Sequence, residues 1–250
     1  GRSESFLPRV PSTVPRRAAR GEIAFTGFGP NSVGLRLSST VDADNRVDAL
    51  ESVAELKGRL LKGAAGVNRG LNCREGEQKE FIDIIEQLEA LNPNTTPNDG
   101  FSDGTSILSG EWKLIFTSAL DVLSLGLLPG IDVGQVFQNI SEDGTEIANI
   151  VDLQPKAAPV FERFTGSTSA RLKVLAASSV EGDKRITLSF RSSQYSPQTL
   201  LGRDVSATLP PLKLSLPQLP GAGWVDTTFI DDDIRVARAF GGNLFVLARV

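Results

Sequence analysis

The stretch LSGEWKLIFTSA, residues 108–119, marks the point where the periodicity of the chain changes. Here Trp112, Leu114 and Phe116 alternate with the residues between them, which is the period of two of a β-strand. Later strand-like segments cover residues 134–141, 145–153, 170–178, 185–191, 204–209, 225–231, 233–239 and 243–249. Turn signals such as EDG at 142–144 and EGDK at 181–184 separate some of them. This pattern predicts an antiparallel barrel or a strongly curved sheet.

Upstream of this stretch, apolar residues recur at helical spacing. Residues 47–61 and 76–91 each place an apolar stripe on one helix face, with Leu50 and Leu61 in the first and Ile84 and Leu88 in the second. Asn92 and Pro93 end the second helix. The sequence therefore predicts an α+β chain, mainly β, in which two N-terminal helices pack on the barrel.

The first forty residues differ in composition from the rest of the chain. They hold six Arg and only two acidic residues, Glu4 and Glu22, together with many Ser and Thr. Two interpretations stay open: an extended basic N-terminal arm on a partner, or a residual transit segment for an organelle. The predicted organisation is an arm or leader at 1–40, a helical region and linker at 41–107, and a barrel at 108–250.

Composition restricts the possible functions. The chain has 250 residues and a formal net charge of −4, so nothing global attracts nucleic acid. It has no His, which removes His-based catalysis and imidazole metal ligands, and its one Cys, Cys73, cannot form an intrachain disulfide. No run reaches the roughly 18 to 20 apolar residues that span a bilayer.

Several segments together resemble the plastid lipid-associated proteins, also called fibrillins or plastoglobulins. The resemblance rests on GVNRGL at 66–71, IIEQLEALNP at 84–93, LSGEWKLIFTSA at 108–119, GQVFQNI at 134–140 and the segment GWVDTTFIDDDIRVARAFGGNLFVLARV that follows Ala222. The chain departs from the family pattern at Ala239, where Gly is usual, and in its long leader. The resemblance implies a lipocalin-like barrel that associates with plastid lipid droplets or thylakoids and holds a hydrophobic small molecule, such as an isoprenoid, a carotenoid or an acyl lipid.

Aromatic residues are distributed over separate predicted strands. In a closed barrel some of them converge on the interior, where they form either a filled core or the wall of a ligand cavity. Trp112 is expected to plug one end of the barrel, with its indole N–H bonded to a carbonyl. The predicted wall consists of Trp112, Phe116, Phe137, Phe229 and Phe245.

Three consecutive aspartates, Asp231 to Asp233, precede Arg235. An EF-hand is excluded, because Arg235 occupies a ligand position and the required Gly is missing. Strand parity puts Asp231, Asp233 and Arg235 on one face, which predicts a stabilising ion pair between the aspartates and Arg235, called here an ion-pair brace. The alternatives are a polar anchor for the head group of a ligand and, less favoured, a catalytic site. We predict no catalytic residues and no metal site.

Two further segments bear on attachment. The Leu-rich stretch at 119–134 is expected to cover the barrel mouth, dip into an interface, dock on a partner, or lie buried under the helices. The Pro-rich stretch at 209–224 is predicted to be an edge or rim segment of the sheet. The resemblance to the family implies a non-enzymatic plastid lipid-binding protein at thylakoids or plastoglobules. The alternative is a peripheral subunit of a thylakoid photosynthetic complex, and action on a lipid as an enzyme comes third.

Overall fold

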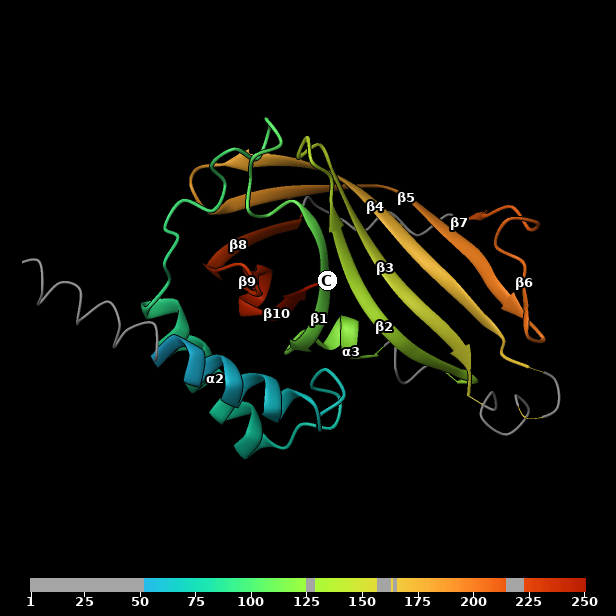
Figure 1. The fold of residues 1–250 in the computed structure, drawn as a ribbon, viewed down its shortest axis with the longest axis horizontal. Helices are drawn as coiled ribbons and strands as arrows, with labels where there is room; N and C mark the ends of the chain where they lie inside the picture. Colours follow the sequence, from blue (N-terminus) through green and yellow to red (C-terminus); the bar gives the residue numbers. More distant parts are fainter. Residues whose placement is uncertain (1–51, 125–128, 157–162, 164–165, 215–222) are drawn as a thin grey trace, which may run out of the picture. The chain divides into compact units, whose positions relative to one another are not determined.

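The computed structural model describes residues 52–124, 129–156, 163, 166–214 and 223–250 (Figure 1). Residues Asn45–Val250 form one compact unit by themselves. The predicted arm at 1–40 lies outside the described residues, and the division into three regions stays a prediction. Among the residues described, no helix is long and apolar enough to cross a membrane.

Two helices precede the strands, as predicted. The described part of the first covers residues 52–64, and the second is α2 (Glu75–Ala90). The N-terminus of α2 is capped by Glu77, whose carboxylate accepts the backbone N–H of Arg74 at 2.8 Å. Its buried face is formed by Phe81, Ile84, Ile85 and Leu88, which belong to the predicted apolar stripe. Both helices therefore present apolar faces to the strands that follow.

The strands are all antiparallel. In chain order the elements are β1 (Gly110–Thr117), α3 (Leu120–Ser124), β2 (Ile131–Ile140), β3 (Glu146–Pro155), β4 (Ser169–Glu181), β5 (Arg185–Leu200), β6 (Arg203–Asp204), β7 (Leu212–Leu214), β8 (Gly223–Ile230), β9 (Ile234–Ala239), the short 3-10 helix η2 (Phe240–Gly242) and β10 (Leu244–Arg249). Strand order β4-β3-β2-β1-β10-β9-β8-β5 and the additional β4–β5 pairing close a barrel, which confirms the predicted fold class.

Two short strands lie outside the barrel circuit, where β6 and β7 both pair with β5. The strand predicted at 204–209 is wrong, because the chain turns there and Thr208 N–H donates to Val205 O at 3.0 Å. The Pro-rich stretch supplies β7, in agreement with its prediction as an edge segment, and its residues 215–222 lie outside the described part.

The two ends of the barrel differ. At the closed end lie the β2–β3, β4–β5 and β8–β9 turns; the opposite end, where β1 ends and β2 begins, is called here the mouth. β1 pairs with β2 only over Gly110–Lys113, whereas the β4–β5 ladder runs from Glu181 and Arg185 to Ser169 and Thr199. Strands β2 to β5 therefore extend past the closed part of the barrel at the mouth (Figure 1).

Two apolar clusters lie on opposite faces of the β-sheet. The inner cluster fills the closed end of the barrel and includes Trp112, Leu114, Ile140, Ile147, Ile186, Ile230 and Leu247. The outer cluster joins the helices to β1, β8, β9 and β10 through Leu60, Ile85, Phe116, Phe229, Val236 and Val246, among others. The helices thus cover one outer wall of the barrel and do not enter it.

β-Bulges decide which face two phenylalanines occupy. Register shifts occur between Leu114 and Phe116 in β1 and between Thr227 and Phe229 in β8. Because one extra residue reverses the alternation, both Phe side chains turn outward to the helices. Phe116 stacks on Phe81 of α2, with ring centroids 4.5 Å apart.

The segment GVNRGL ties the helical region to the barrel mouth. Thr117 N–H donates to Arg69 O at 2.9 Å, and the Arg69 guanidinium donates to Gly134 O at 2.6 Å and to Val133 O at 3.1 Å. Gly70 has a φ of +107°, and a Cβ there would lie 2.4 Å from Thr117 O. Only glycine fits this close approach without strain.

Candidate ligand-binding site

The predicted aromatic wall is divided between the two faces of the barrel. Trp112 is fully buried at the closed end, and its indole N–H donates to Leu108 O at 2.8 Å, as expected. Phe245 also packs on the inner cluster. Phe116 and Phe229 lie in the outer cluster because of the bulges, contrary to the predicted placement. A role for these four residues in ligand binding stays a prediction.

Phe137 also departs from the predicted wall. Its neighbours on β2, Val136 and Gln138, point inward: Val136 packs on the inner cluster and Gln138 bonds a fully buried arginine of the interior. Alternation then turns Phe137 outward. It does not face the interior, so its predicted role in binding a ligand also stays untested.

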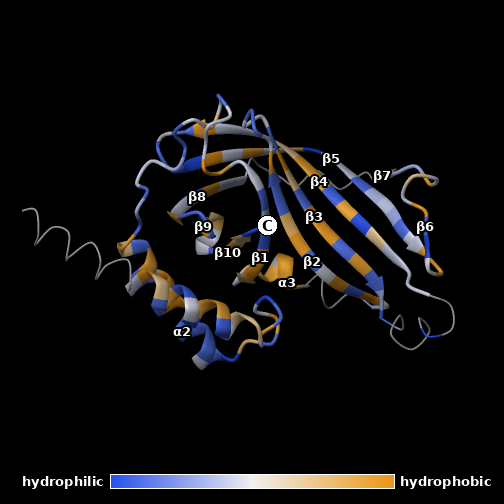
Figure 2. Cartoon of the chain, viewed as in Figure 1, coloured by the Kyte–Doolittle hydropathy of each residue, from blue (hydrophilic) through white to orange (hydrophobic). Residues whose placement is uncertain are grey.

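The interior near the mouth is lined by two apolar rows of directly paired residues. The first row is Val136, Val151, Leu172 and Tyr195, and the second is Val133, Leu153, Ala170 and Pro197. Directly paired residues share a face, and Val136 packs on the inner cluster, so these mouth rows face inward. Figure 2 shows hydrophobic and hydrophilic residues alternating along β2, β3 and β4.

A chain of polar side chains crosses the interior between the mouth rows and the closed end. Arg235 is fully buried; its Nε–H donates to Thr227 Oγ1 at 3.1 Å and its Nη1–H donates to Gln138 Oε1 at 2.7 Å. Gln138 in turn donates to Asn149 Oδ1 at 3.0 Å. Burial lowers the pKa of Arg235 to about 10, because the cation loses its hydration.

The polar residues beside Arg235 were not predicted. Gln138, Asn149 and Thr227 are uncharged, and each lies inside an otherwise ordinary strand-like segment. The available signal was a polar residue at an inward position of a strand, which becomes readable only once the bulges and the register are known.

The three aspartates form the turn between β8 and β9, and not a strand. Asp231 Oδ1 accepts the backbone N–H groups of Asp233 at 2.9 Å and Ile234 at 2.8 Å, and Asp231 N–H donates to Ile234 O at 3.0 Å. Strand parity therefore does not apply across these residues, and the predicted ion-pair brace with Arg235 is wrong. An assignment of Asp231 and Asp233 to a ligand stays a prediction.

The counter-ion of the aspartates comes from the first helix. Lys57 Nζ donates to Asp231 Oδ2 and Asp233 Oδ2, each at 2.7 Å. Partial burial by itself would lower the pKa of Lys57, but the hydrogen bonds to both carboxylates outweigh it and raise that pKa. The same hydrogen bond lowers the pKa of Asp233. The aspartates thus brace the helix against the closed end.

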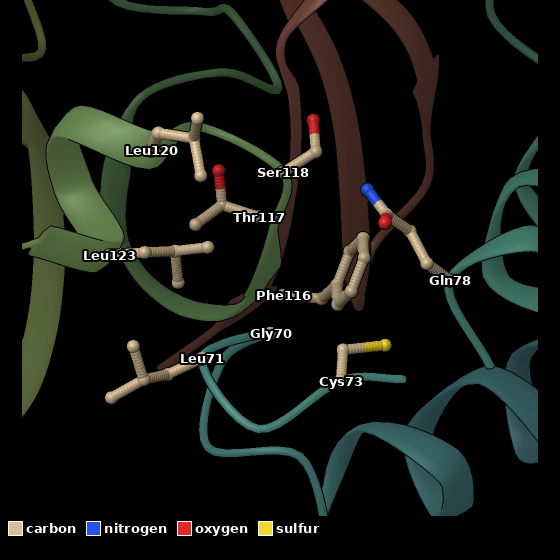
Figure 3. Close-up of a pocket in the computed structure, with 9 residues that line it drawn as sticks. All are labelled: Gly70, Leu71, Cys73, Gln78, Phe116, Thr117, Ser118, Leu120 and Leu123. Carbon is tan, nitrogen blue, oxygen red and sulfur yellow. The ribbon is translucent and has the colours of Figure 1, made fainter. Parts of the chain in front are cut away.

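A separate pocket of about 360 Å³ opens beside the mouth (Figure 3). Its lining comes from the segment after the first helix, from α2, from the end of β1 and from α3: Gly70, Leu71, Cys73, Gln78, Phe116, Thr117, Ser118, Leu120 and Leu123. In the Leu-rich stretch, Val122 packs on the inner cluster while Leu120 is 79% exposed. This stretch therefore contributes both to the barrel mouth and to the surface, and its residues 125–128 lie outside the described part.

The described residues contain no group of three or more Cys, Asp or Glu side chains placed to hold a metal ion. The site assembled by the barrel is instead apolar at the mouth, with one buried cation deeper inside. Such a lining suits an apolar or amphiphilic organic molecule.

Comparison with known proteins gives a consistent set of relatives. A family model described as PAP_fibrillin matches residues 54–248. Plastid lipid-associated protein 2, chloroplastic, of Brassica campestris is 28% identical over 240 residues, which cover 85% of this chain and 74% of that protein. Probable plastid-lipid-associated protein 2, chloroplastic, of Arabidopsis thaliana is 27% identical over 264 residues, which cover 94% of this chain and 81% of that protein. Plastoglobulin-1, chloroplastic, of Pisum sativum is 27% identical over 263 residues, which cover 93% of this chain and 70% of that protein.

Proposed function

Because the chain belongs to the PAP_fibrillin family and its relatives are chloroplastic, we propose that this plastid protein binds a hydrophobic small molecule or lipid in its barrel, at thylakoids or plastoglobules. The occupant is an isoprenoid, a carotenoid or an acyl lipid. The observation that carries the proposal is the pair of inward-facing mouth rows on strands that extend past the closed barrel. The function is binding and includes no catalytic step.

The mouth rows supply the driving force for such a ligand. Burial of apolar surface stabilises by about 25 cal/mol per Å², so a long apolar chain lying along both rows gains several kcal/mol, offset by its lost freedom. The rows lie next to the barrel opening, whereas Trp112, Ile140 and Ile147 fill the closed end. We therefore assign the ligand to the mouth half of the barrel.

The test is a mass-spectrometric analysis of organic extracts from the protein purified from plastids, together with a titration of the purified chain with apolar ligands. Leu172→Gln places an amide inside the mouth rows and should weaken saturable binding about tenfold. Its neighbour Lys173→Gln, on the opposite face of β4, is the matched control. Extracts without an apolar molecule, combined with no saturable binding, would refute the proposal.

Attachment to a lipid surface is assigned to the mouth end. Leu120 and Phe240 are 79% and 74% exposed, and both adjoin the place where Ser118 N–H donates to Leu244 O at 3.1 Å. Exposed large apolar side chains at one end of a protein favour contact with a membrane or lipid-droplet surface. With this end against the lipid phase, a ligand passes into the mouth without crossing water.

Flotation with lipid vesicles tests the attachment. Leu120→Ser combined with Phe240→Ser should reduce the bound fraction, because two apolar contacts are lost. Val180→Ser is the control, since Val180 is 42% exposed near the turn at the closed end. Equal flotation of the double variant and the control would exclude the mouth end as the lipid contact.

The second candidate is a peripheral subunit of a thylakoid photosynthetic complex. The filled closed end of the barrel favours it, because packed side chains there leave less of the interior to a ligand. Co-purification of the full-length protein with such a complex, together with lipid-free extracts, would decide for this alternative.

A further inference from the structure

The barrel interior contains a cation that apolar ligand binding does not explain. On β9, Ile234 and Val236 pack in the outer cluster under the helices, so Arg235 between them points into the barrel. Its side chain is fully buried. A guanidinium in this position is costly, since the interior replaces its hydration shell with apolar groups.

The charge of Arg235 is not balanced by the described part of the chain. Its two hydrogen-bond acceptors, Thr227 Oγ1 and Gln138 Oε1, are neutral. Nη2 is buried and has no hydrogen-bond partner among the residues that the structure describes. Its lowered pKa has burial as its cause, with no contribution from an acidic side chain.

Other basic side chains of the barrel provide the contrast. Arg171, Arg185 and Arg238 each pair with a carboxylate, at 2.9 Å, 2.7 Å and 2.7 Å respectively. All three of these pairs are partly exposed to solvent, where an ion pair contributes least to stability. The deepest guanidinium of the four is thus the one with a buried terminal nitrogen, Nη2, that has no hydrogen-bond partner among the described residues.

The location of Arg235 matches an amphiphile. Gln138 and Asn149 form the cross-strand pair next to Val136 and Val151, so Arg235 lies beside the inner edge of the mouth rows. Gln138 also receives the Nη1–H bond and donates to Asn149, which fixes the orientation of the guanidinium. A molecule that entered from the mouth with its apolar chain along these rows would bring its leading end toward Arg235, and side chains around the buried Nη2 would have to shift for the two to pair.

We propose that the molecule bound in the barrel carries a carboxylate, which pairs with Arg235 through Nη2 while its apolar chain lies along the mouth rows. This inference rests on the proposed function and names the class of ligand, a long-chain organic acid. A singly charged head group balances a single guanidinium. Since Nε and Nη1 already have acceptors, Nη2 is the nitrogen left to pair, and one carboxylate oxygen satisfies it, whereas a doubly charged phosphate would bring more charge than this cation balances.

The experiment titrates the full chain with palmitic acid, hexadecanol and methyl palmitate, which share one apolar chain and differ in the head group. The acid should bind at least about tenfold more tightly than either neutral ligand, as expected for a hydrogen bond to a charged partner. Arg235→Gln should abolish this preference, so that the acid and the two neutral ligands then bind with similar affinity. Arg171→Gln removes a positive charge from the outer face of β4 and should keep the preference.

A second measurement does not depend on the folding of a variant. Palmitic acid with a ¹³C-labelled carboxyl group, bound to the wild-type protein, should remain ionised to a lower pH than the same acid in vesicles without protein, because a neighbouring cation lowers its pKa. Arg235→Lys keeps the positive charge, so the pKa of the bound acid should still be lowered in that variant.

The outcomes separate the two proposals. Equal binding of the acid and the neutral ligands, or a preference that persists in Arg235→Gln, overturns the carboxylate assignment and leaves the proposed function intact. A bound carboxyl group that titrates as it does in vesicles also overturns it. If none of the three ligands binds, the carboxylate assignment fails, and the extract analysis decides the proposed function separately.

Discussion

Asp231→Ala should destabilise the protein far more than Asp233→Ala, although both carboxylates bond the same lysine at 2.7 Å. The Asp231 side chain is 20% exposed and accepts two backbone N–H groups in addition to Lys57. Asp233 is 76% exposed, and within the described part of the chain its carboxylate hydrogen-bonds to Lys57 alone. The difference follows from the turn, because Asp231 organises its backbone and Asp233 does not.

The magnitude follows from these contacts. Hydrogen bonds to a charged group contribute about 1.5 to 3 kcal/mol when buried, and partial exposure reduces each of the three at Asp231, so Asp231→Ala should cost about 2 to 3 kcal/mol. The exposed contact of Asp233 should contribute less than about 0.5 kcal/mol. For a domain of this size these values correspond to a loss of about 5 to 10 °C in Tm against about 1 to 2 °C.

Thermal unfolding followed by circular dichroism, with urea unfolding at pH 7, measures both variants. Asp231→Asn separates the backbone hydrogen bonds from the ion pair, because its amide oxygen still accepts the backbone N–H groups while the charge pair with Lys57 is lost. We expect this variant to lose about 1 kcal/mol of unfolding free energy. Equal losses for Asp231→Ala and Asp233→Ala, or a loss below about 0.5 kcal/mol for Asp231→Ala, would show that the turn does not depend on this carboxylate.

Three other predictions follow from single contacts. The difference in unfolding free energy between wild type and Lys57→Met should be constant from about pH 5 to pH 10. This difference should shrink when the pH rises beyond the raised pKa of Lys57, above 10.5, and when the pH falls through the lowered pKa of Asp233, below 3.8. A change between about pH 5 and pH 10 in urea titrations would contradict the pairing. Gly70→Ala should cost more than about 1 kcal/mol in urea unfolding, because its Cβ would meet Thr117 O, whereas Gly76→Ala in α2, with nothing within 4 Å, should be neutral or stabilising. Phe116→Ala should cost about 3 to 5 kcal/mol by the same measurement and Phe137→Ala about 1 kcal/mol, and the reverse order would contradict the outward placement of Phe137.

The fold class was predictable because periodicity reports burial directly. The change from helical spacing to alternation at Leu108 predicted helices followed by strands, and the turn signals at 142–144 and 181–184 mark real hairpins. Closure of the barrel came from the family resemblance, since alternation does not specify which strands pair.

The site was less predictable, for reasons tied to single residues. Strict alternation from Leu114 and Thr227 puts Phe116 and Phe229 inside, and a bulge of one residue in each strand reverses that result. The cation that pairs with Asp231 is Lys57, which is 174 residues away in the sequence, so the local pattern pointed to Arg235 instead. A missing counter-ion, as at Arg235, is a property of the assembled interior and has no signature in the sequence.

The pairing of β1 with β10 has a consequence for how the molecule assembles. Trp112 pairs with Arg249, whose guanidinium lies 4.2 Å from the Trp112 ring and also bonds Ser109 O. Until β10 has been synthesised, β1 has one unpaired edge, and the contacts that seal the barrel are among the most distant in sequence. Such long-range pairing is slow and leaves unpaired edges that can associate with other chains. A nascent chain therefore needs protection until its final strand emerges, and truncation before Leu244 should yield an aggregating protein and not a smaller barrel.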